Sequence, residues 1–244
     1  MMPHAAKKGD LEMVKHLIQR GMWVNIGDHY CRTALHRAAQ LGHYEIVKYL
    51  ISCKSELNFK DRAGNTPVLL AGDAGKKDVV DFLLKCGARA NCANGDKCTL
   101  LHFAAGNGWE DVEQEQEVVD FLLECGARVN CTNDDKCTLL HFATGNGWTD
   151  VVGRLLKYEE IDLNATNQEG ESALMWAARD GRKDVIAILL RVGADVLGKR
   201  RLDLNLQDRF GRTPLHRACY KGHLAVLRQL LESFIGMAPT VDDP

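Results

Sequence analysis

Four histidines recur at similar places along the chain, and their side chains are the first candidates for chemistry. They are His36, His102, His141 and His216. Cys98 and Cys137 each lie four residues before one of these histidines, a spacing that two metal ligands or a Cys–His nucleophile could use. Such a site needs more converging groups than one pair, and the sequence holds no CxxC pair to supply them. We therefore expect structural histidines, no metal and no cofactor.

The cysteines also allow a redox interpretation, which the sequence disfavours. The chain has nine cysteines, an odd number, and its first residues lack the apolar centre of a secretion signal. Cys92 and Cys98, like Cys131 and Cys137, flank one predicted turn and could approach each other across it. We favour the alternative that they are thiols packed as small apolar side chains. We predict that these four cysteines are reduced and metal-free.

Neither motifs nor net charge support catalysis or nucleic-acid binding. The sequence has no GxxxxGK[ST] loop, no GxGxxG after a strand, and no Ser, His and Asp in a hydrolase arrangement. The formal net charge is −2, so the whole chain creates no field that attracts a polyanion or an anionic membrane. No apolar run approaches the roughly 20 residues of a membrane span. We predict a non-enzymatic protein of the cytoplasm or nucleus, without nucleic-acid or membrane partners.

The histidines belong to a sequence pattern that repeats along the chain. Segments such as TALHRAAQLGHYEIVKYL (33–50) and TPLHRACYKGHLAVLRQLL (213–231) follow one template. Its first residue falls at positions 33, 66, 99, 138, 172 and 213, and a seventh copy without its opening fits at the N-terminus. The steps of 33, 33, 39, 34 and 41 residues indicate stacked repeats.

Each copy carries the signals of two helices joined by a turn. A Thr or Ser at the first position can accept a hydrogen bond from a helix N-terminus, and Pro67 and Pro214 follow where a missing donor costs nothing. Two small residues then allow close helix approach, and a glycine ends the helix in the left-handed conformation. An apolar stripe with spacings of three and four marks the second helix. Because one unit cannot bury its apolar faces alone, the units must stack into a solenoid.

At these residues the sequence resembles the ankyrin-repeat family, over nearly all of positions 4–236. The resemblance implies an all-α solenoid in which each unit is a β-turn finger followed by two antiparallel helices. It also implies that the TPLH histidine bonds the backbone of adjoining loops. We predict one monomeric domain over 1–244, with units at about 1–27, 28–60, 61–93, 94–132, 133–166, 167–207 and 208–236 and a polar tail at 237–244.

Three features depart from the pattern. Six extra residues around EQEQE (113–117) suggest a lengthened second helix, and eight around 197–204 enlarge one finger. The fingertip glycine of three units is replaced in three others, by Cys31, Lys97 and Lys136. Because glycine adopts the left-handed conformation without strain and these residues do not, the geometry of their fingers is an open question.

One duplication is nearly verbatim, because residues 79–111 and 118–150 differ at six of 33 positions. It places Trp109 and Trp148 at equivalent sites, each beside a Gly–Asn pair. Trp is enriched in interface hot spots, so the two could bound a shallow aromatic trough, although packing explains a single buried Trp equally well. The duplication is either a recent copy or a pair of identical surfaces.

The resemblance implies that partners bind the fingers and the residue pair before each inter-helix glycine. In the C-terminal units these positions combine Arg with aromatic side chains, as interfaces do. The candidate partner-binding residues are Trp176, Arg179, Asp180, Lys199, Arg200, Arg201, Phe210, Arg212, Tyr220 and Lys221, with Trp109 and Trp148 in addition. We predict an interaction module or scaffold that holds a protein or peptide with an acidic segment in a concave groove. The alternative is a ligand-sensing regulatory segment of a larger enzyme or channel, where the tryptophans or the basic finger bind a small anion.

In the ankyrin family, the Asn that follows the second helix can be hydroxylated when an acidic residue lies two positions before it and a Leu eight before it. Asn58, Asn164 and Asn205 match that pattern. The other interpretation is a structural Asn whose side chain satisfies turn backbone groups.

Overall fold

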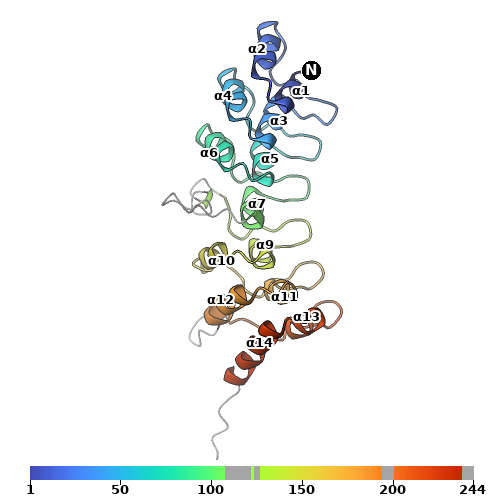
Figure 1. Ribbon diagram of the computed structural model, residues 1–244, viewed down its shortest axis with the longest axis vertical. Coiled ribbons are helices and arrows are strands. Elements are labelled where there is room, and N and C mark those ends of the chain that lie inside the picture. Colours follow the sequence, from blue (N-terminus) through green and yellow to red (C-terminus); the bar gives the residue numbers. More distant parts are fainter. Residues whose placement is uncertain (108–121, 124–126, 194–200, 238–244) are drawn as a thin grey trace, which may run out of the picture. The chain divides into compact units, whose positions relative to one another are not determined.

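The computed structural model describes residues 1–107, 122–123, 127–193 and 201–237 of the 244-residue chain. Helices and the turns between them make up this part of the protein (Figure 1). It contains no β-strand, only three isolated bridges, which join Ala93 to Thr99, Thr132 to Thr138 and Thr166 to Ser172. The predicted all-α fold is therefore confirmed.

The helices alternate between a first and a second helix of each repeat. The first helices are α1 (Met2–Lys8), α3 (Ala34–Leu41), α5 (Pro67–Asp73), α7 (Leu100–Asn107), α9 (Leu139–Asn146), α11 (Ala173–Arg179) and α13 (Pro214–Lys221). The second helices are α2 (Leu11–Gln19), α4 (Tyr44–Ser52), α6 (Lys77–Lys85), α10 (Thr149–Leu155), α12 (Lys183–Gly193) and α14 (Leu224–Met237). The lengthened helix expected around 113–117 lies outside the described residues.

The chain divides into two compact units, 1–128 and 129–244. In the first unit α1, α3, α5 and α7 lie side by side in that order, with α2, α4 and α6 as a second row (Figure 1). In the second unit α9, α11 and α13 form one row, and α10, α12 and α14 form the other (Figure 1). Within each unit, a first helix thus contacts the first helix of the next described repeat.

Small and branched apolar residues form the core between neighbouring pairs. Ala38 and Ala39 on α3, like Ala177 and Ala178 on α11, have 0% exposed surface, so adjacent first helices approach closely. The second helices bury Leu stripes, for example Leu189 at 0% exposure. Burying one such side chain stabilises the fold by about 1.5–3 kcal/mol, which a repeat gains only beside its neighbour.

Every described finger is a tight turn that ends in the left-handed conformation. The N–H of Lys136 donates to the carbonyl of Asn133 (3.0 Å), and the equivalent bond joins Gly211 to Asp208 (2.8 Å). The residues that replace glycine keep the same geometry, with φ of 60° at Cys31, 57° at Lys97 and 59° at Lys136, against 72° at Gly211. Substitution of the glycine has therefore left the shape of the fingers unchanged.

Neighbouring fingers are linked by single backbone hydrogen bonds. In the first unit the N–H of Arg62 donates to the carbonyl of Tyr30 (2.9 Å), and the next finger repeats the contact from Gly95 to Ala63 (2.7 Å). In the second unit Arg209 donates to Glu169 in the same way (2.9 Å). These bonds fix the register of one finger on the next.

The repeated histidines fasten each repeat to the following finger. The Nδ1 atom of His141 accepts from the N–H of Thr138 (3.1 Å), and its Nε2–H donates to the carbonyl of Glu171 (2.9 Å). His36 makes the equivalent contacts with Thr33 and Asn65. Burial lowers the pKa of both rings and keeps them neutral. The structural role expected of these two histidines is confirmed.

Candidate functional site

The candidate residues of the second unit gather along α11, α13 and the fingers that precede them. Trp176 and Arg179 lie on α11, and Asp180 follows it. Phe210 and Arg212 lie on the finger before α13, whose last turn carries Tyr220 and Lys221. Because α11 and α13 are neighbours, these seven residues belong to one region, which we call the α11–α13 surface.

Trp176 is wedged between α9 and the side chains of its own repeat. Its ring meets that of Phe142 edge to face at 6.1 Å, and a Cβ added to Gly145 would lie 2.9 Å from it. The guanidinium of Arg179 lies over the ring at 5.1 Å and is held by a bidentate pair with Asp180 (2.9 and 2.8 Å). Stacking against Arg leaves the indole half-buried in a fixed orientation.

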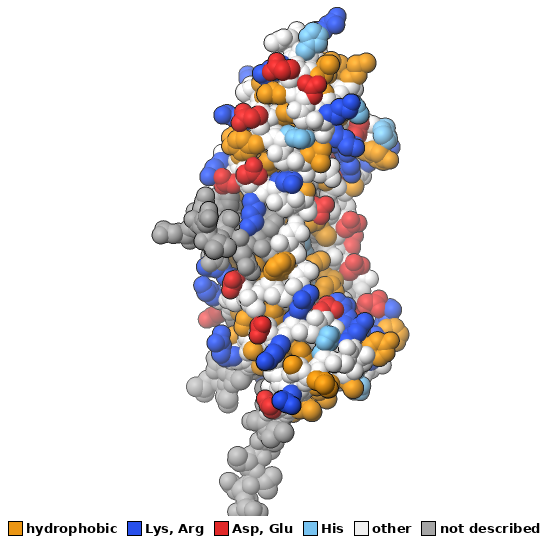
Figure 2. Space-filling view, viewed as in Figure 1, with side chains coloured by type: hydrophobic (Ala, Val, Ile, Leu, Met, Phe, Trp, Pro, Cys, Tyr) orange, Lys and Arg blue, Asp and Glu red, His pale blue; other side chains and the backbone are white. Residues whose placement is uncertain are grey.

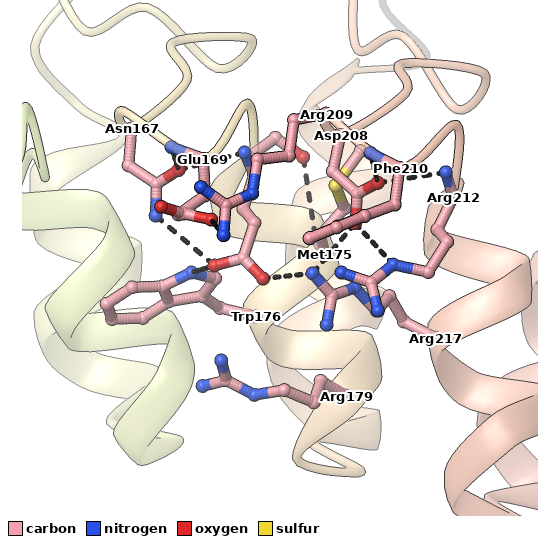
Figure 3. Close-up of polar contacts among 12 residues, drawn as sticks. Asn167, Glu169, Met175, Trp176, Arg179, Asp208, Arg209, Phe210, Arg212 and Arg217 are labelled. Atoms are coloured by element: carbon pink, nitrogen blue, oxygen red, sulfur yellow. Dashed lines mark hydrogen bonds and ion pairs between the residues drawn. The ribbon is translucent and has the colours of Figure 1, made fainter.

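A buried ionic network lies beneath this surface (Figure 3). Arg217 of α13 pairs with Glu171 of the preceding finger and with Asp208 of its own finger (2.8 Å to Asp208). Glu171 also accepts a hydrogen bond from the indole Nε1–H of Trp176 (2.8 Å). Sequence reasoning missed Arg217, since it looked for exposed finger and helix-end positions. The sequence feature that could have identified Arg217 is the Asp nine residues before it. Asp28 and Arg37 have the same spacing and form the same ion pair (Nη2–Oδ2, 2.6 Å).

Asp208 holds its finger together through every oxygen lone pair it can offer. Its Oδ1 accepts from the N–H groups of Phe210 (2.8 Å) and Arg212 (3.0 Å), and its Oδ2 accepts from the side chains of Arg212 and Arg217 (2.8 Å each). Burial opposes the charge, but these bonds outweigh it and lower the pKa of Asp208. Arg212, which the sequence marked only as a partner-binding residue, therefore also stabilises the fold.

Two aromatic side chains of the α11–α13 surface remain open to solvent. Phe210 is 61% exposed and lies under the guanidiniums of Arg209 (4.7 Å) and Arg212 (4.4 Å). Tyr220 is 86% exposed, with the Nζ of Lys221 5.9 Å from its ring centroid. These residues contribute little to the core, so they are available to a partner.

The remaining candidates are placed less favourably or lie outside the described residues. Trp109, Lys199 and Arg200 are in the latter class. Arg201 is exposed, and its carbonyl accepts from Asn164 Nδ2 (2.7 Å). Trp148 is the half-buried residue before α10. Elsewhere in the second unit, Trp176 packs against Gly145 and meets the ring of Phe142.

The position of Trp148 has a packing role in other repeats. In four described pairs the residue after an inter-helix glycine lies over the equivalent glycine of the preceding repeat, for example His43 over Gly9 and His223 over Gly181. The same residue often donates to the preceding helix end, for example Arg182 Nε to the carbonyl of Gly145 (2.9 Å). The glycine equivalent for Trp148 is Gly108, which lies outside the described residues, so packing and an aromatic trough both stand as interpretations of Trp148.

Two of the three Asn residues that match the hydroxylation pattern bridge to the next repeat. Asn58 Oδ1 accepts from the N–H of Arg89 (2.9 Å), and Asn164 Oδ1 accepts from that of Asp203 (2.8 Å). Asn205 is exposed, and its side chain has no hydrogen-bond partner among the residues that the structure describes. The three sites thus differ in accessibility.

The first unit holds a separate pocket of about 280 Å³. α1 supplies His4 and Lys7 to it, and the following finger supplies Asp28 and His29, with Arg37 of α3 beside them. Arg37 is occupied by Asp28. His4, Lys7 and His29 are the polar groups left to face a ligand, and they suit an anion.

Nothing in the described ranges forms a group of three His, Cys, Asp or Glu that could hold a metal ion. None of the eight cysteines described there forms a disulfide. A helix long and apolar enough to cross a bilayer is also missing from this part of the chain.

Comparisons with known proteins agree with the geometry. A three-copy model of ankyrin repeats matches residues 1–61, 51–130 and 109–200, and a many-copy model matches 174–231. Inversin of Danio rerio is 42% identical over 74 residues, which are 30% of this chain and 7% of inversin. Protein phosphatase 1 regulatory subunit 27 of Homo sapiens is 33% identical over 92 residues, 38% of this chain and 54% of that protein.

The chain therefore matches less than two thirds of either relative. Among solved structures, the human ASB11 ankyrin repeat domain is similar with a TM-score of 0.75 and 26% identity. That match covers 93% of this chain and 96% of the ASB11 domain, so the likeness extends over nearly all repeats.

Proposed function

Since the chain belongs to the ankyrin-repeat family, we propose that it is a non-enzymatic interaction module or scaffold whose protein partner contacts the α11–α13 surface. Ankyrin repeats generally bind proteins, and one relative is named a phosphatase regulatory subunit. The observation that carries the proposal is the exposure of Phe210 and Tyr220 beside a rigid ionic network, since anchored aromatic side chains are typical hot spots.

The charges of this surface narrow the chemistry of the partner. Arg179, Arg209, Arg212 and Arg217 are each paired with a carboxylate of the same unit. Lys221 and Arg201 have no acidic partner among the described residues. An acidic segment of the partner would therefore contact these two cations, while its apolar side chains meet Phe210 and Tyr220.

The test is a binding titration with a partner captured from cells and then purified. Phe210→Ala combined with Tyr220→Ala should weaken binding by about 2 kcal/mol or more, roughly a 30-fold rise in Kd. Arg212 is left intact because its removal would take one of two guanidiniums away from the buried carboxylate of Asp208. The matched control is Tyr30→Ala, at the same fingertip position in the first unit. Equal affinities for the wild type and the double variant would reject the surface.

The pocket of the first unit favours a second function, the sensing of a small anion within a larger protein. His4, Lys7 and His29 offer three donors around a volume that fits a phosphate or a small carboxylate. A thermal-shift series with phosphate, citrate and chloride tests this idea. Stabilisation that disappears in Lys7→Ala would support sensing, and the absence of any shift would leave the interaction module alone.

We also propose that the protein resides in the cytoplasm or nucleus as a monomer. Imaging of the tagged full-length chain and sedimentation of the purified one are the measurements. Secretion of the chain, or a stable dimer, would contradict these two proposals.

A further inference from the structure

An arginine, an aromatic ring and a carboxylate repeatedly occur together on the fingers and first helices. In each set the guanidinium lies 4.4–5.7 Å from the ring centroid and 2.8–3.1 Å from a carboxylate oxygen. Its face contacts the ring while its N–H groups point outward to the acid, so one side chain serves both partners. Three such sets are Tyr30–Arg32–Asp61, Trp176–Arg179–Asp180 and Phe210–Arg212–Asp208.

The fingertip carboxylate of Asp135 lacks the arginine that its counterpart in the next repeat has. Asp135 and Glu169 occupy the same fingertip position in consecutive repeats of the second unit. Glu169 pairs with Arg209 of the following finger. The residue that corresponds to Arg209 beside Asp135 is Gln168, whose Nε2–H donates to the carbonyl of Asp134 instead. Asp135 is exposed, and no cation within the described ranges pairs with it.

Aromatic rings lie on the helices next to this fingertip. Phe142 has the position in its repeat that Arg217, which contacts its own finger, has in the last one. The rings of Phe142 and Trp176 meet edge to face at 6.1 Å, and both are half-buried, so part of each faces solvent. Asp134 and Lys136 flank Asp135, which gives the fingertip a net charge of −1. Acidic side chains are visible at the finger edge near α9 (Figure 2).

We propose that α9 and the finger before it bind an arginine side chain of the protein partner, which completes a further set of ring, guanidinium and carboxylate. The guanidinium stacks on Phe142 and pairs with Asp135. A lysine would supply the charge without the planar face that stacks on a ring. The inference rests on the proposed function, because the same partner also contacts the α11–α13 surface.

The arginine sets the register of the partner along the second unit. Asp135 and Phe210 occupy the same fingertip position two repeats apart. Packed helices lie about 8–10 Å from each other, so two repeats separate these fingertips by roughly 16–20 Å. An extended segment rises about 3.3 Å per residue and spans that distance in about five or six residues. The partner therefore presents an arginine near α9 and, about five or six residues away, the apolar side chain that meets Phe210.

Trp176 supplies a local reporter for this site, because its ring contacts Phe142 and its indole Nε1–H donates to Glu171 (2.8 Å). The probes are otherwise uncharged Gly–Ser peptides with one arginine and one phenylalanine, in both orders, spaced about two, five or ten positions apart. A matched peptide carries citrulline, the neutral analogue of arginine. Each peptide is titrated into the nitrogen-15-labelled full chain, and the indole N–H signals are followed by NMR. A Trp176→Phe variant assigns the reporter signal.

Two exposed aspartates of the same repeat make a matched pair of variants. Asp135→Asn removes the proposed carboxylate, and Asp150→Asn removes the same charge from α10. Both should keep the wild-type circular dichroism spectrum. We expect the arginine peptide with the five-position spacing to shift the Trp176 signal and to bind at least about threefold more tightly than the citrulline peptide. Asp135→Asn should raise its Kd about two- to fivefold, and Asp150→Asn less than about 1.5-fold.

Equal affinities of the arginine and citrulline peptides would overturn the proposal, and so would an unchanged Kd in Asp135→Asn. Equal binding at all three spacings would reject the register. The double variant Phe210→Ala with Tyr220→Ala separates this inference from the proposed function. If it abolishes binding while citrulline replaces arginine without effect, the α11–α13 surface stands and the arginine site is wrong. If it has no effect while citrulline and Asp135→Asn weaken binding, the arginine site stands and the α11–α13 surface is wrong.

Discussion

Two kinds of finger occur in this protein, and they differ in the residue that organises the turn. In one kind the residue is an aspartate, at Asp28, Asp61 and Asp208, and in the other it is an asparagine, at Asn94, Asn133 and Asn167. Both kinds use one side-chain oxygen to accept backbone N–H groups of the finger, for example Asp28 from Tyr30 (2.9 Å) and Asn167 from Glu169 (2.9 Å). The turn itself is therefore indifferent to the charge.

The two kinds of finger differ at the second polar atom of this side chain, which is Oδ2 in the aspartates and Nδ2 in the asparagines. Each aspartate has a guanidinium on its Oδ2, from Arg37 for Asp28, from Arg32 for Asp61 and from Arg217 for Asp208. Nine residues after each asparagine stands an aromatic side chain instead, Phe103, Phe142 or Trp176. A partly or fully buried carboxylate is stabilised where an arginine reaches it, and a neutral amide occurs where the residue nine positions later is aromatic and supplies no guanidinium.

Removing the arginine from a charged finger should have the largest effect. In Arg217→Met, the carboxylates of Asp208 and Glu171, with side chains 0% and 11% exposed, lose a shared guanidinium. We expect a loss of about 3–5 kcal/mol in the free energy of unfolding, measured by urea denaturation. Arg37→Met should cost less, because Asp28 is 19% exposed.

Converting the whole finger to the neutral kind sharpens this experiment. Asp208→Asn with Arg217→Phe reproduces the pair found at Asn133 and Phe142. If the charge rule is correct, the double variant is more stable than Arg217→Met alone, since no carboxylate is stranded on the finger. If the double variant is no more stable than Arg217→Met, the proposed difference between aspartate and asparagine fingers is wrong.

Lowering the pH should weaken the protein in two separate steps. The folded-state pKa values of His36 and His141 lie below the ordinary value of 6.5 because the rings are buried, so their neutral form is the folded form. Their contribution is complete above pH 6.5 and is lost as the pH falls toward the lowered values. Asp28 and Asp208 have lowered pKa values as well, so theirs is lost only below the ordinary value of 3.8. Urea midpoints between pH 7.5 and 3 measure both steps, and His141→Gln should flatten the first.

Fingertip substitutions should have a smaller effect that is independent of the kind of finger. Lys136 adopts φ of 59°, which strains a residue with a Cβ, so Lys136→Gly should stabilise the fold by about 0.5 kcal/mol after the entropic cost of glycine. Gly211 has φ of 72°, and an added Cβ would meet only Gln207, 3.8 Å away. Gly211→Lys should therefore cost about 1 kcal/mol through backbone strain alone. Thermal melts resolve both changes, and equal melting temperatures would remove strain as the cause.

Hydroxylation of the three asparagines should leave the stability of the fold nearly unchanged. The order in which they are modified should follow the exposure of their side chains. Asn58 and Asn164 are held by the next repeat, whereas the side chain of Asn205 is exposed. An asparaginyl hydroxylase followed by mass spectrometry should therefore modify Asn205 first. Equal or reversed occupancy would show that access does not set the order, and oxygen on other asparagines would reject the sequence pattern.

The sequence predicted the repeats well because local chemistry specifies them. Thr33 caps α3, Gly42 ends it at φ 75°, and His36 bonds the next finger, all as the pattern indicates. Long-range pairing was harder to predict. Arg217 looked like an ordinary helix residue, because one of the carboxylates that it meets, Glu171, comes from the preceding repeat. Arg212 looked like a free surface cation, because only the folded turn of its own finger brings it to Asp208.

The contact between inter-helix glycines and the following repeat has a consequence for how such a chain can evolve. A methyl group on Gly181 would lie 2.7 Å from the ring of His223, which is held in place by its bond to the carbonyl of Arg179 (3.0 Å). At Gly42 the opposing group is the flexible Lys76, which can move aside. The residue that follows a glycine in the next repeat therefore decides whether that glycine can be substituted. Substitutions should accumulate as correlated pairs about 34–42 positions apart, and recombination that separates such a pair should be selected against.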